Sequence, residues 1–272
     1  MKELIISLFS LFTFFSLTYA QTSEEFNQQG VENGISGNYN DAINLFTKAI
    51  LLDPNFAEAY NNRGNAYNNL QNYSNAILDF NKAIEINPNY AGAYYNRGSA
   101  YDDLQDYPNA ILDYNKAIEI NPNYAEAYCN RGISYAKGFQ NYSKAILDFT
   151  KAIEIDSTDA GAYYNRGLAY NCLQEYYKAI SDFTKAIEFD PNNAHAYFNR
   201  GFAYGKGFKE YSKAISDYTK ALEIEPNNAD TYINRGINYY YSGNTIKACE
   251  DWHKAYSLGR TDVNKLLNKY CK

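Results

Sequence analysis

The stretch AGAYYNRGSAYDDLQDYPNAILDYNKAIEINPNY, residues 91–124, decides the fold because it recurs along the chain with few changes. An Arg-Gly pair marks six of the copies, beginning at Arg63, Arg97, Arg131, Arg166, Arg200 and Arg235. Successive pairs are 34, 34, 35, 34 and 35 residues apart. A fixed period in this range is typical of a solenoid, in which each unit buries its apolar face only against its neighbours. A catalytic pocket is not the default expectation for such an array.

Alignment of the copies divides the chain into seven units, which are residues 23–56, 57–90, 91–124, 125–159, 160–193, 194–228 and 229–260. Apolar residues at spacings of three and four predict two helices in each unit, as at Tyr60, Gly64 and Tyr67. A proline such as Pro88 then ends the second helix. The fourth and sixth units each contain one extra residue, within 136–139 and 205–208, which we expect to lengthen the turn between their helices.

The order of large and small residues within a unit resembles the tetratricopeptide repeat (TPR). In the third unit the resemblance is carried by Tyr94, Gly98, Tyr101, Tyr107, Ala110, Tyr114, Ala117 and Pro122. Close equivalents occur in the other units, so the resemblance covers nearly all of the chain after residue 22. It implies an all-α fold, a right-handed superhelical solenoid of about seven helix-turn-helix TPR units whose first helices line a concave groove.

A further helix is expected over residues 261–272. Gly259 is a helix-stop signal and Thr261 is a suitable N-cap. One face of the helix then carries Val263, Leu266, Leu267 and Tyr270. We expect this face to cover the last unit, because the end of a solenoid requires a polar outer surface.

Two charged residues recur at fixed positions in units two to seven. Position 7 is Arg, and position 23 is Asp79, Asp113, Asp148, Asp182, Asp217 and Asp251. In the first unit Gln29 and Leu45 occupy both places. Because the charges appear and disappear together, we expect each Arg to pair with the Asp of its own unit. Exposed pairs are worth only about 0–1 kcal/mol and would align the helices more than stabilise them. The alternative is a basic stripe for acidic ligands.

Residues 1–20 have the features of a secretory signal peptide. Lys2 precedes an apolar run from Leu4 to Leu17, and Ala20 precedes polar sequence. The run is shorter than the roughly 20 apolar residues that span a bilayer. We therefore expect cleavage, no stable membrane insertion afterwards, and a periplasmic or secreted protein. The alternative is an uncleaved membrane anchor.

Cys249 and Cys271 are expected to form a disulfide in such an oxidising compartment. Cys249 lies nine residues before Leu258 in the last second helix, and Cys271 lies nine residues after Asp262 in the final helix. Each segment is about 13.5 Å long at 1.5 Å per residue, so an antiparallel return brings the two sulfurs level. The alternative is two reduced thiols.

Composition and motifs argue against several classes of function. A net charge of -6 is unfavourable for binding a phosphate backbone, so no nucleic-acid partner is expected. His195 and His253, the two histidines, belong to no metal-binding motif, and no nucleotide-binding or hydrolase motif is present. Cys129 and Cys172 are offset by about 12 Å along neighbouring helices and should not bond to each other. We expect neither an enzyme nor a cofactor or metal site.

The resemblance places ligand contacts at positions 2, 5, 6, 9, 12 and 13 of the first helices. Position 6 is asparagine in six units, and the four in the expected contact region are Asn130, Asn165, Asn199 and Asn234. An amide both donates and accepts, so such a row can hydrogen-bond an extended peptide backbone without reading its sequence. The alternative is that these residues only suit the fold.

Positions 5 and 9 become apolar in the later units, at Tyr164, Leu168, Phe198, Phe202, Ile233 and Ile237, and Tyr240 and Tyr241 join them in the last unit. Apolar surface in a concavity concentrates binding energy, so we expect the main contact site in units four to seven. The alternative is tighter packing between first helices. The sequence thus predicts an exported, non-enzymatic scaffold that binds an extended segment of a protein or peptide partner. The alternatives are a carbohydrate or cell-wall binding module and an oligomerising structural or regulatory module.

Overall fold

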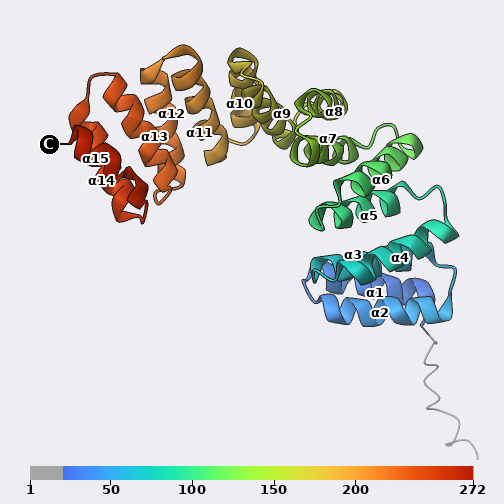
Figure 1. Cartoon of the computed structure of the whole chain (residues 1–272). Coiled ribbons are helices and arrows are strands. Elements are labelled where there is room, and N and C mark those ends of the chain that lie inside the picture. Colours follow the sequence, from blue (N-terminus) through green and yellow to red (C-terminus); the bar gives the residue numbers. More distant parts are fainter. Residues whose placement is uncertain (1–20, 272) are drawn as a thin grey trace, which may run out of the picture. The chain divides into compact units, whose positions relative to one another are not determined.

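The computed structural model describes residues 21–271, in which every regular element is helical (Figure 1). The predicted signal peptide, residues 1–20, lies outside the described residues. None of the helices in the described range is both long and apolar enough to cross a membrane. The helices form two compact parts, an N-terminal part that ends at Pro88 and a C-terminal part that begins at Asn89.

The N-terminal part contains the first two helix pairs. The helices are α1 (Ser23–Ile35), α2 (Tyr39–Leu52), α3 (Ala57–Asn69) and α4 (Tyr73–Ile86). Each packs against the next along the chain. Thr22 and Glu25 form a capping box at the start of α1, which satisfies backbone N–H groups that the helix itself leaves unpaired.

The C-terminal part continues the same arrangement through five more pairs and a final helix. Its elements are α5 (Ala91–Asp103), α6 (Tyr107–Ile120), α7 (Ala125–Phe139), α8 (Tyr142–Ile155), α9 (Ala160–Cys172), α10 (Tyr176–Phe189), α11 (Ala194–Ala203), a π-helical turn η1 (Tyr204–Phe208), α12 (Tyr211–Ile224), α13 (Ala229–Tyr241), α14 (Thr245–Ser257), a 3-10 turn η2 (Thr261–Val263) and α15 (Asn264–Tyr270). Helices that follow one another pack together. The described residues thus form an all-α array of sequential pairs, consistent with about seven TPR units and a C-terminal helix.

Each pair closes around a ring that lies against a glycine. A Cβ atom added to Gly167 of α9 would lie 2.7 Å from Cε1 of Phe183 in α10, and one added to Gly64 would lie 2.6 Å from Cε1 of Phe80. Both rings are fully buried. Because protein interiors are close-packed, a larger residue at either glycine must displace the ring.

The extra residue of the fourth and sixth units does not lengthen the turn between helices, contrary to expectation. It extends α7 to 15 residues, against 13 in α5 and α9. In the sixth unit it falls in the π-helical turn η1. The reason is packing onto the preceding unit. A Cβ on Gly138 would lie 2.6 Å from the Tyr107 ring, and one on Gly207 2.6 Å from the Tyr176 ring.

Each repeated arginine is bound on three sides. In the fifth unit Nε and Nη2 of Arg166 each donate to a carboxylate oxygen of Asp182 at 2.8 Å. Its Nη1 donates to Oγ1 of Thr150 in the preceding unit at 3.1 Å, and the guanidinium lies 5.6 Å from the centre of the Tyr163 ring. The hydrogen bonds to Asp182 raise the pKa of Arg166. One guanidinium therefore connects three helices.

The other units repeat this arrangement, with a two-pronged Arg–Asp pair in each of units two to seven. The pairs are not exposed. The arginine side chains are 16–19% accessible and the aspartates 7–9%. Removal of one partner should therefore be costly, because it leaves the other charge largely buried and unpaired. The arginine donors are occupied inside the protein, which does not support the alternative of a basic stripe for acidic ligands.

The final helix covers the end of the array. Val263 and Leu267 are buried beside Trp252, whereas Asn264 and Lys265 are exposed. The chain does not enter this helix as expected. Residues 261–263 form the 3-10 turn and α15 begins only at Asn264, and within the described range no side chain caps either start.

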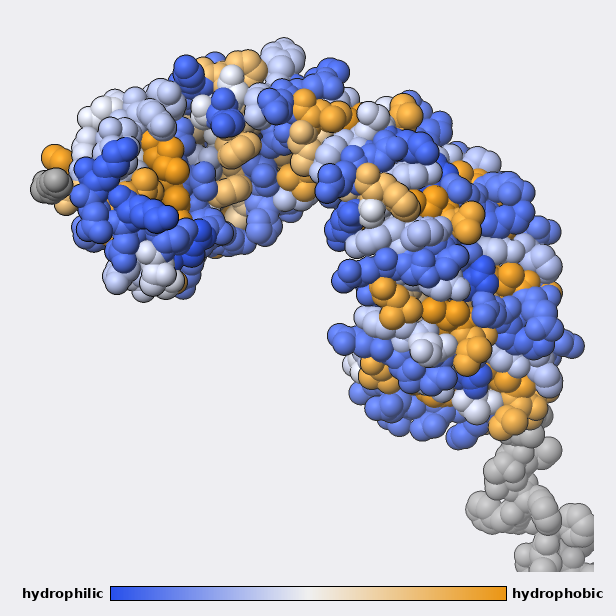
Figure 2. All heavy atoms as spheres, viewed as in Figure 1, coloured by the Kyte–Doolittle hydropathy of each residue, from blue (hydrophilic) through white to orange (hydrophobic). Residues whose placement is uncertain are grey.

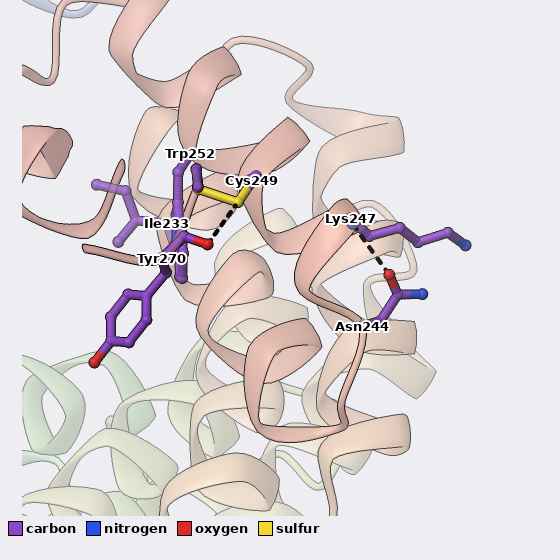
Figure 3. Close-up of a disulfide and its surroundings, with 7 residues drawn as sticks. Ile233, Asn244, Lys247, Cys249, Trp252 and Tyr270 are labelled. Carbon is purple, nitrogen blue, oxygen red and sulfur yellow. Dashed lines mark hydrogen bonds between the residues drawn. A yellow bond between two sulfur atoms is a disulfide. The ribbon is translucent and has the colours of Figure 1, made fainter. Parts of the chain in front are cut away.

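Cys249 of α14 and Cys271 after α15 form a disulfide in this structure, with Cα atoms 5.6 Å apart (Figure 3). The Cys249 sulfur also lies 3.7 Å from the carbonyl oxygen of Tyr270. Cys129 and Cys172 are free. The bond joins the final helix to the last helix pair.

We expect alkylation without reductant to leave Cys249 and Cys271 unmodified while it labels Cys172, and reduction to expose both. Mass spectrometry of the digested protein measures this. Replacing both by serine should lower the free energy of unfolding by about 3 kcal/mol, the value for a loop of this size. Full labelling of Cys249 and Cys271 in the unreduced protein would contradict the bond.

Asp182→Ala is expected to destabilise the array by about 3–5 kcal/mol, because it leaves the partly buried Arg166 without its counter-charge. Glu188→Ala is the control, since it breaks the exposed Lys185–Glu188 pair and should leave the stability nearly unchanged. Urea unfolding followed by circular dichroism measures both. Equal stabilities of the two variants would show that the buried pair contributes no more than an exposed one.

Candidate functional site

The predicted contact residues lie on the first helices of the C-terminal part. There α7 contacts α5 on one side and α9 on the other, and α9 contacts α11. Residues at equivalent positions of these helices are therefore neighbours. On the face shown in Figure 2, apolar residues form small groups separated by hydrophilic ones.

The asparagine row is partly engaged within the protein. Nδ2 of Asn130 donates to the hydroxyl of Tyr95 at 3.1 Å, and Nδ2 of Asn199 donates to the hydroxyl of Tyr164 at 3.3 Å. Both bonds reach the first helix of the preceding unit. Asn234 donates instead to the carbonyl oxygen of Asp230, one turn earlier in α13. Three of the four predicted asparagines thus contribute to the fold.

Asn165 differs from the other three. Its side chain forms no hydrogen bond with any residue of the described range 21–271. The reason lies one unit earlier, where Cys129 occupies the position that holds the tyrosine for Asn130 and Asn199. The Cys129 thiol lies 3.6 Å from a carboxylate oxygen of Asp159 and offers no hydroxyl to Asn165. The Asn165 amide can therefore both donate to a ligand and accept from it.

Several of the predicted apolar residues mainly serve packing. The Tyr164 ring lies 5.9 Å from Phe183 and the Phe198 ring 5.5 Å from Tyr218, each within its own unit. The C-terminal core cluster includes partly buried Ile233, Ile237 and Tyr240. These contacts favour the alternative that tighter packing explains the residues.

Other predicted residues remain accessible. Phe202 of α11 is 36% exposed and Tyr241 of α13 is 62% exposed. The Tyr241 ring stacks on Tyr211 at 5.6 Å, with an interplanar angle of 17°. Leu168 is half-buried in the wall of a pocket.

This pocket, termed the 4/5 junction pocket, lies between the fourth and fifth units and has a volume of about 440 Å³. Its lining includes Ile133, Ala136 and Lys137 of α7 together with Asn165, Leu168 and Cys172 of α9. Ile133, Ala136, Lys137 and Cys172 were not among the predicted site residues. A signal for them existed in the sequence, because they occupy ligand-contact positions 9, 12 and 13 of their units.

Among the residues that the structure describes, no cluster of three or more His, Cys, Asp or Glu side chains could hold a metal ion. Burial raises the pKa of the Cys129 thiol to about 12, so this thiol is a poor nucleophile at neutral pH. The arrangement instead offers hydrogen-bonding amides and apolar surface, which suit binding.

Comparison with known families gives three matches. A TPR repeat family model matches residues 35–71, 98–138, 140–171 and 209–243. Two tetratricopeptide repeat models match residues 57–90 with 160–193 and residues 80–111 with 183–215. No curated protein sequence matches the chain.

Solved structures show the same fold. The C-terminal part of a TPR repeat-containing protein from Cytophaga hutchinsonii is 25% identical, with a TM-score of 0.70 over 87% of this chain and 96% of that one. YrrB, a TPR protein with an unusual peptide-binding site, is 27% identical, with a TM-score of 0.62 over 70% and 97%. A tetratricopeptide repeat protein from Parabacteroides merdae is 24% identical and similar in fold, with a TM-score of 0.64 over 92% and 99%.

TPR units form a scaffold that implies protein–protein interaction, and proteins of this type are typically non-enzymatic. One TPR repeat model alone covers more than half of the 272 residues. Fifteen α-helices within residues 21–271 pack in sequential pairs. The chain therefore belongs to the tetratricopeptide repeat family.

Proposed function

We propose that this TPR scaffold is exported and binds an extended segment of another protein along the first helices of its C-terminal part. The observation that carries the proposal is the Asn165 amide, which is unpaired within the described residues. Leu168, one turn later on the same helix, is half-buried, and Phe202, at the equivalent position of the next first helix, is 36% exposed.

The chemistry of this arrangement suits a peptide. An extended backbone presents one N–H donor and one C=O acceptor per residue. Removing either group from water without a hydrogen-bond partner costs free energy. An amide side chain satisfies one of each without reading the sequence. Apolar side chains beside it supply the burial that dominates binding energy. Asn165 would thus align the segment and its apolar neighbours would hold it.

Similarity to YrrB supports this assignment, since the name of that structure describes a peptide-binding site and the two chains are 27% identical. Export is supported by two separate features. Residues 1–20 have the composition of a signal peptide, and Cys249 lies within bonding distance of Cys271. Disulfides persist in oxidising compartments and are rare in the cytosol.

Carbohydrate is a second candidate ligand, favoured by the exposed Tyr241 ring stacked on Tyr211. Flat aromatic faces and amide groups also suit sugars. Binding of the mature chain to immobilised glycans, without binding to any peptide, would favour this candidate.

Peptide binding is tested by selecting 12-residue peptides from a random display library against residues 21–272. Fluorescence anisotropy then measures the Kd of the selected peptides. Asn165→Ala should weaken binding about 5- to 150-fold, because two hydrogen bonds of about 0.5–1.5 kcal/mol each are lost. Asn192→Ala, in the exposed loop between α10 and α11, should leave the Kd unchanged. Equal affinities for Asn165→Ala and the unmodified chain would exclude Asn165 from the site.

Export is tested by N-terminal sequencing of the protein recovered from the exported fraction of its native cell. Cleavage after Ala20 should yield a chain that begins at Gln21, because the small residue precedes polar sequence as a cleavage site requires. Recovery of the protein only inside the cell, with residues 1–20 intact, would contradict export.

A further inference from the structure

The 4/5 junction pocket exists because two facing positions are both small. Position 12 of the fourth unit is Ala136, and position 10 of the fifth unit is Ala169. Both line the pocket, and the ring of Phe149, only 1% exposed, lies behind them. The missing side-chain volume at these two positions therefore becomes the cavity.

Other junctions of the C-terminal part place a polar side chain at one or both of these positions. Between units three and four, Asp102 accepts a hydrogen bond from Ser134 at 2.7 Å. Between units five and six, position 12 is Asn171, whose Oδ1 is buried. Between units six and seven, a Cβ on Gly205 would lie 2.5 Å from Oδ1 of Asn238. A side chain thus occupies the space that is open between units four and five.

In the N-terminal part a cavity likewise opens where both of these positions are small. Gly34 and Ala66 occupy positions 12 and 10 where units one and two meet, and a pocket of about 270 Å³ opens there. Residues at the same repeat positions line this pocket and the 4/5 junction pocket, but the side chains at two of these positions differ in polarity or charge. Asn65 replaces Leu168 and Ile35 replaces Lys137. The 4/5 junction pocket is therefore distinguished by more apolar walls and by a cation.

Lys137 supplies this cation at the mouth of the pocket. It is exposed and forms no ion pair with any residue in the range 21–271. Burial raises the pKa of the Asp102 carboxyl, and the nearby positive charge of Lys137 acts to lower this pKa. The carboxylate oxygens of Asp102 already accept hydrogen bonds from Ser134 and Tyr114. The ammonium group of Lys137 is thus available for an anionic group of a ligand.

We infer that the 4/5 junction pocket receives a leucine- or phenylalanine-sized apolar side chain of the bound segment, and that Lys137 pairs with a carboxylate next to it. The inference rests on the proposed function and adds the kind of segment that is recognised. Asn165 lies in the lining, so the backbone it holds passes the pocket mouth. The volume of about 440 Å³ falls within the range of about 300–1,000 Å³ typical of ligand sites.

Occupancy of the pocket can be measured through a cysteine in its lining. Cys172 is a free, exposed thiol in the pocket lining. Cys129 is half-buried with a raised pKa, and Cys249 and Cys271 are joined in a disulfide. In the unreduced protein an alkylating reagent should therefore react chiefly at Cys172, and a side chain in the pocket should block it.

The test uses residues 21–272 and four synthetic ten-residue peptides of Gly, Ser and Asn. They carry one Leu, one Glu, an adjacent Leu-Glu pair, or neither. The Leu-Glu peptide should bind at least about tenfold more tightly than the peptide with neither residue, since burial of one leucine supplies that much. It should also slow alkylation of Cys172, measured by mass spectrometry, whereas the Glu peptide should not.

Three variants test where the peptide binds. Ala136→Asn fills the pocket with the residue that units two and five already carry at this position, Asn68 and Asn171. It should abolish both the leucine preference and the protection of Cys172. Gly34→Asn makes the matched change in the N-terminal pocket, where a Cβ meets no atom within 4 Å, and should leave both intact. Lys137→Gln should remove only the preference for Glu.

The outcomes separate this inference from the proposed function. Peptide binding that depends on Asn165 but shows neither leucine preference nor Cys172 protection would overturn the pocket assignment and leave the proposed function standing. Binding of no peptide from these or the displayed sets would overturn both. Cys172 protection in the unmodified chain needs no variant, so the test holds even if Ala136→Asn fails to fold.

Discussion

The buried Arg–Asp pair is the interaction on which the rest of the structure depends. One arginine joins the first helix of its unit to the second through a carboxylate and, in the units where the third bond is seen, to the preceding unit through a threonine or asparagine side chain. Such a pair has strict geometry, because both charges lose hydration and must satisfy each other. In units two to seven, repetition of this geometry helps to set the positions of the first helices, and with them the positions of the asparagines.

Helix pairs could be predicted from the sequence because they depend on local patterns. Each first helix of units one to seven begins at the residue where the period places a new unit, from Ser23 to Ala229. The extra residue near Gly138 could not be placed in the same way. Its helical conformation depends on the Tyr107 ring of the preceding unit, a contact that no local pattern encodes. The structure differs from the sequence-based expectation where packing between units overrides the local conformational preference within a unit.

The candidate site could likewise be predicted only where it depends on local sequence patterns and not on contacts between units. The row of asparagines is visible in the sequence, but which amide remains unpaired depends on a residue 36 positions earlier, Cys129 for Asn165. A hydroxyl there would occupy the amide, as Tyr164 does for Asn199. Apolar residues of the first helices were likewise visible, yet their role depends on the ring that each one meets. Tyr164 and Phe198 lie against such rings, whereas Phe202 remains accessible.

The junction rule has a consequence for how this array can change. Whether a cavity opens depends on two side chains, contributed by consecutive repeats, and each repeat contacts only its neighbours. Exchanging a small pair such as Ala136 and Ala169 for a polar pair such as Asp102 and Ser134 would close the cavity at that junction, and the reverse exchange at another junction would open one there. The spacing between cavities can thus change in steps of one repeat, while the architecture that carries them stays constant.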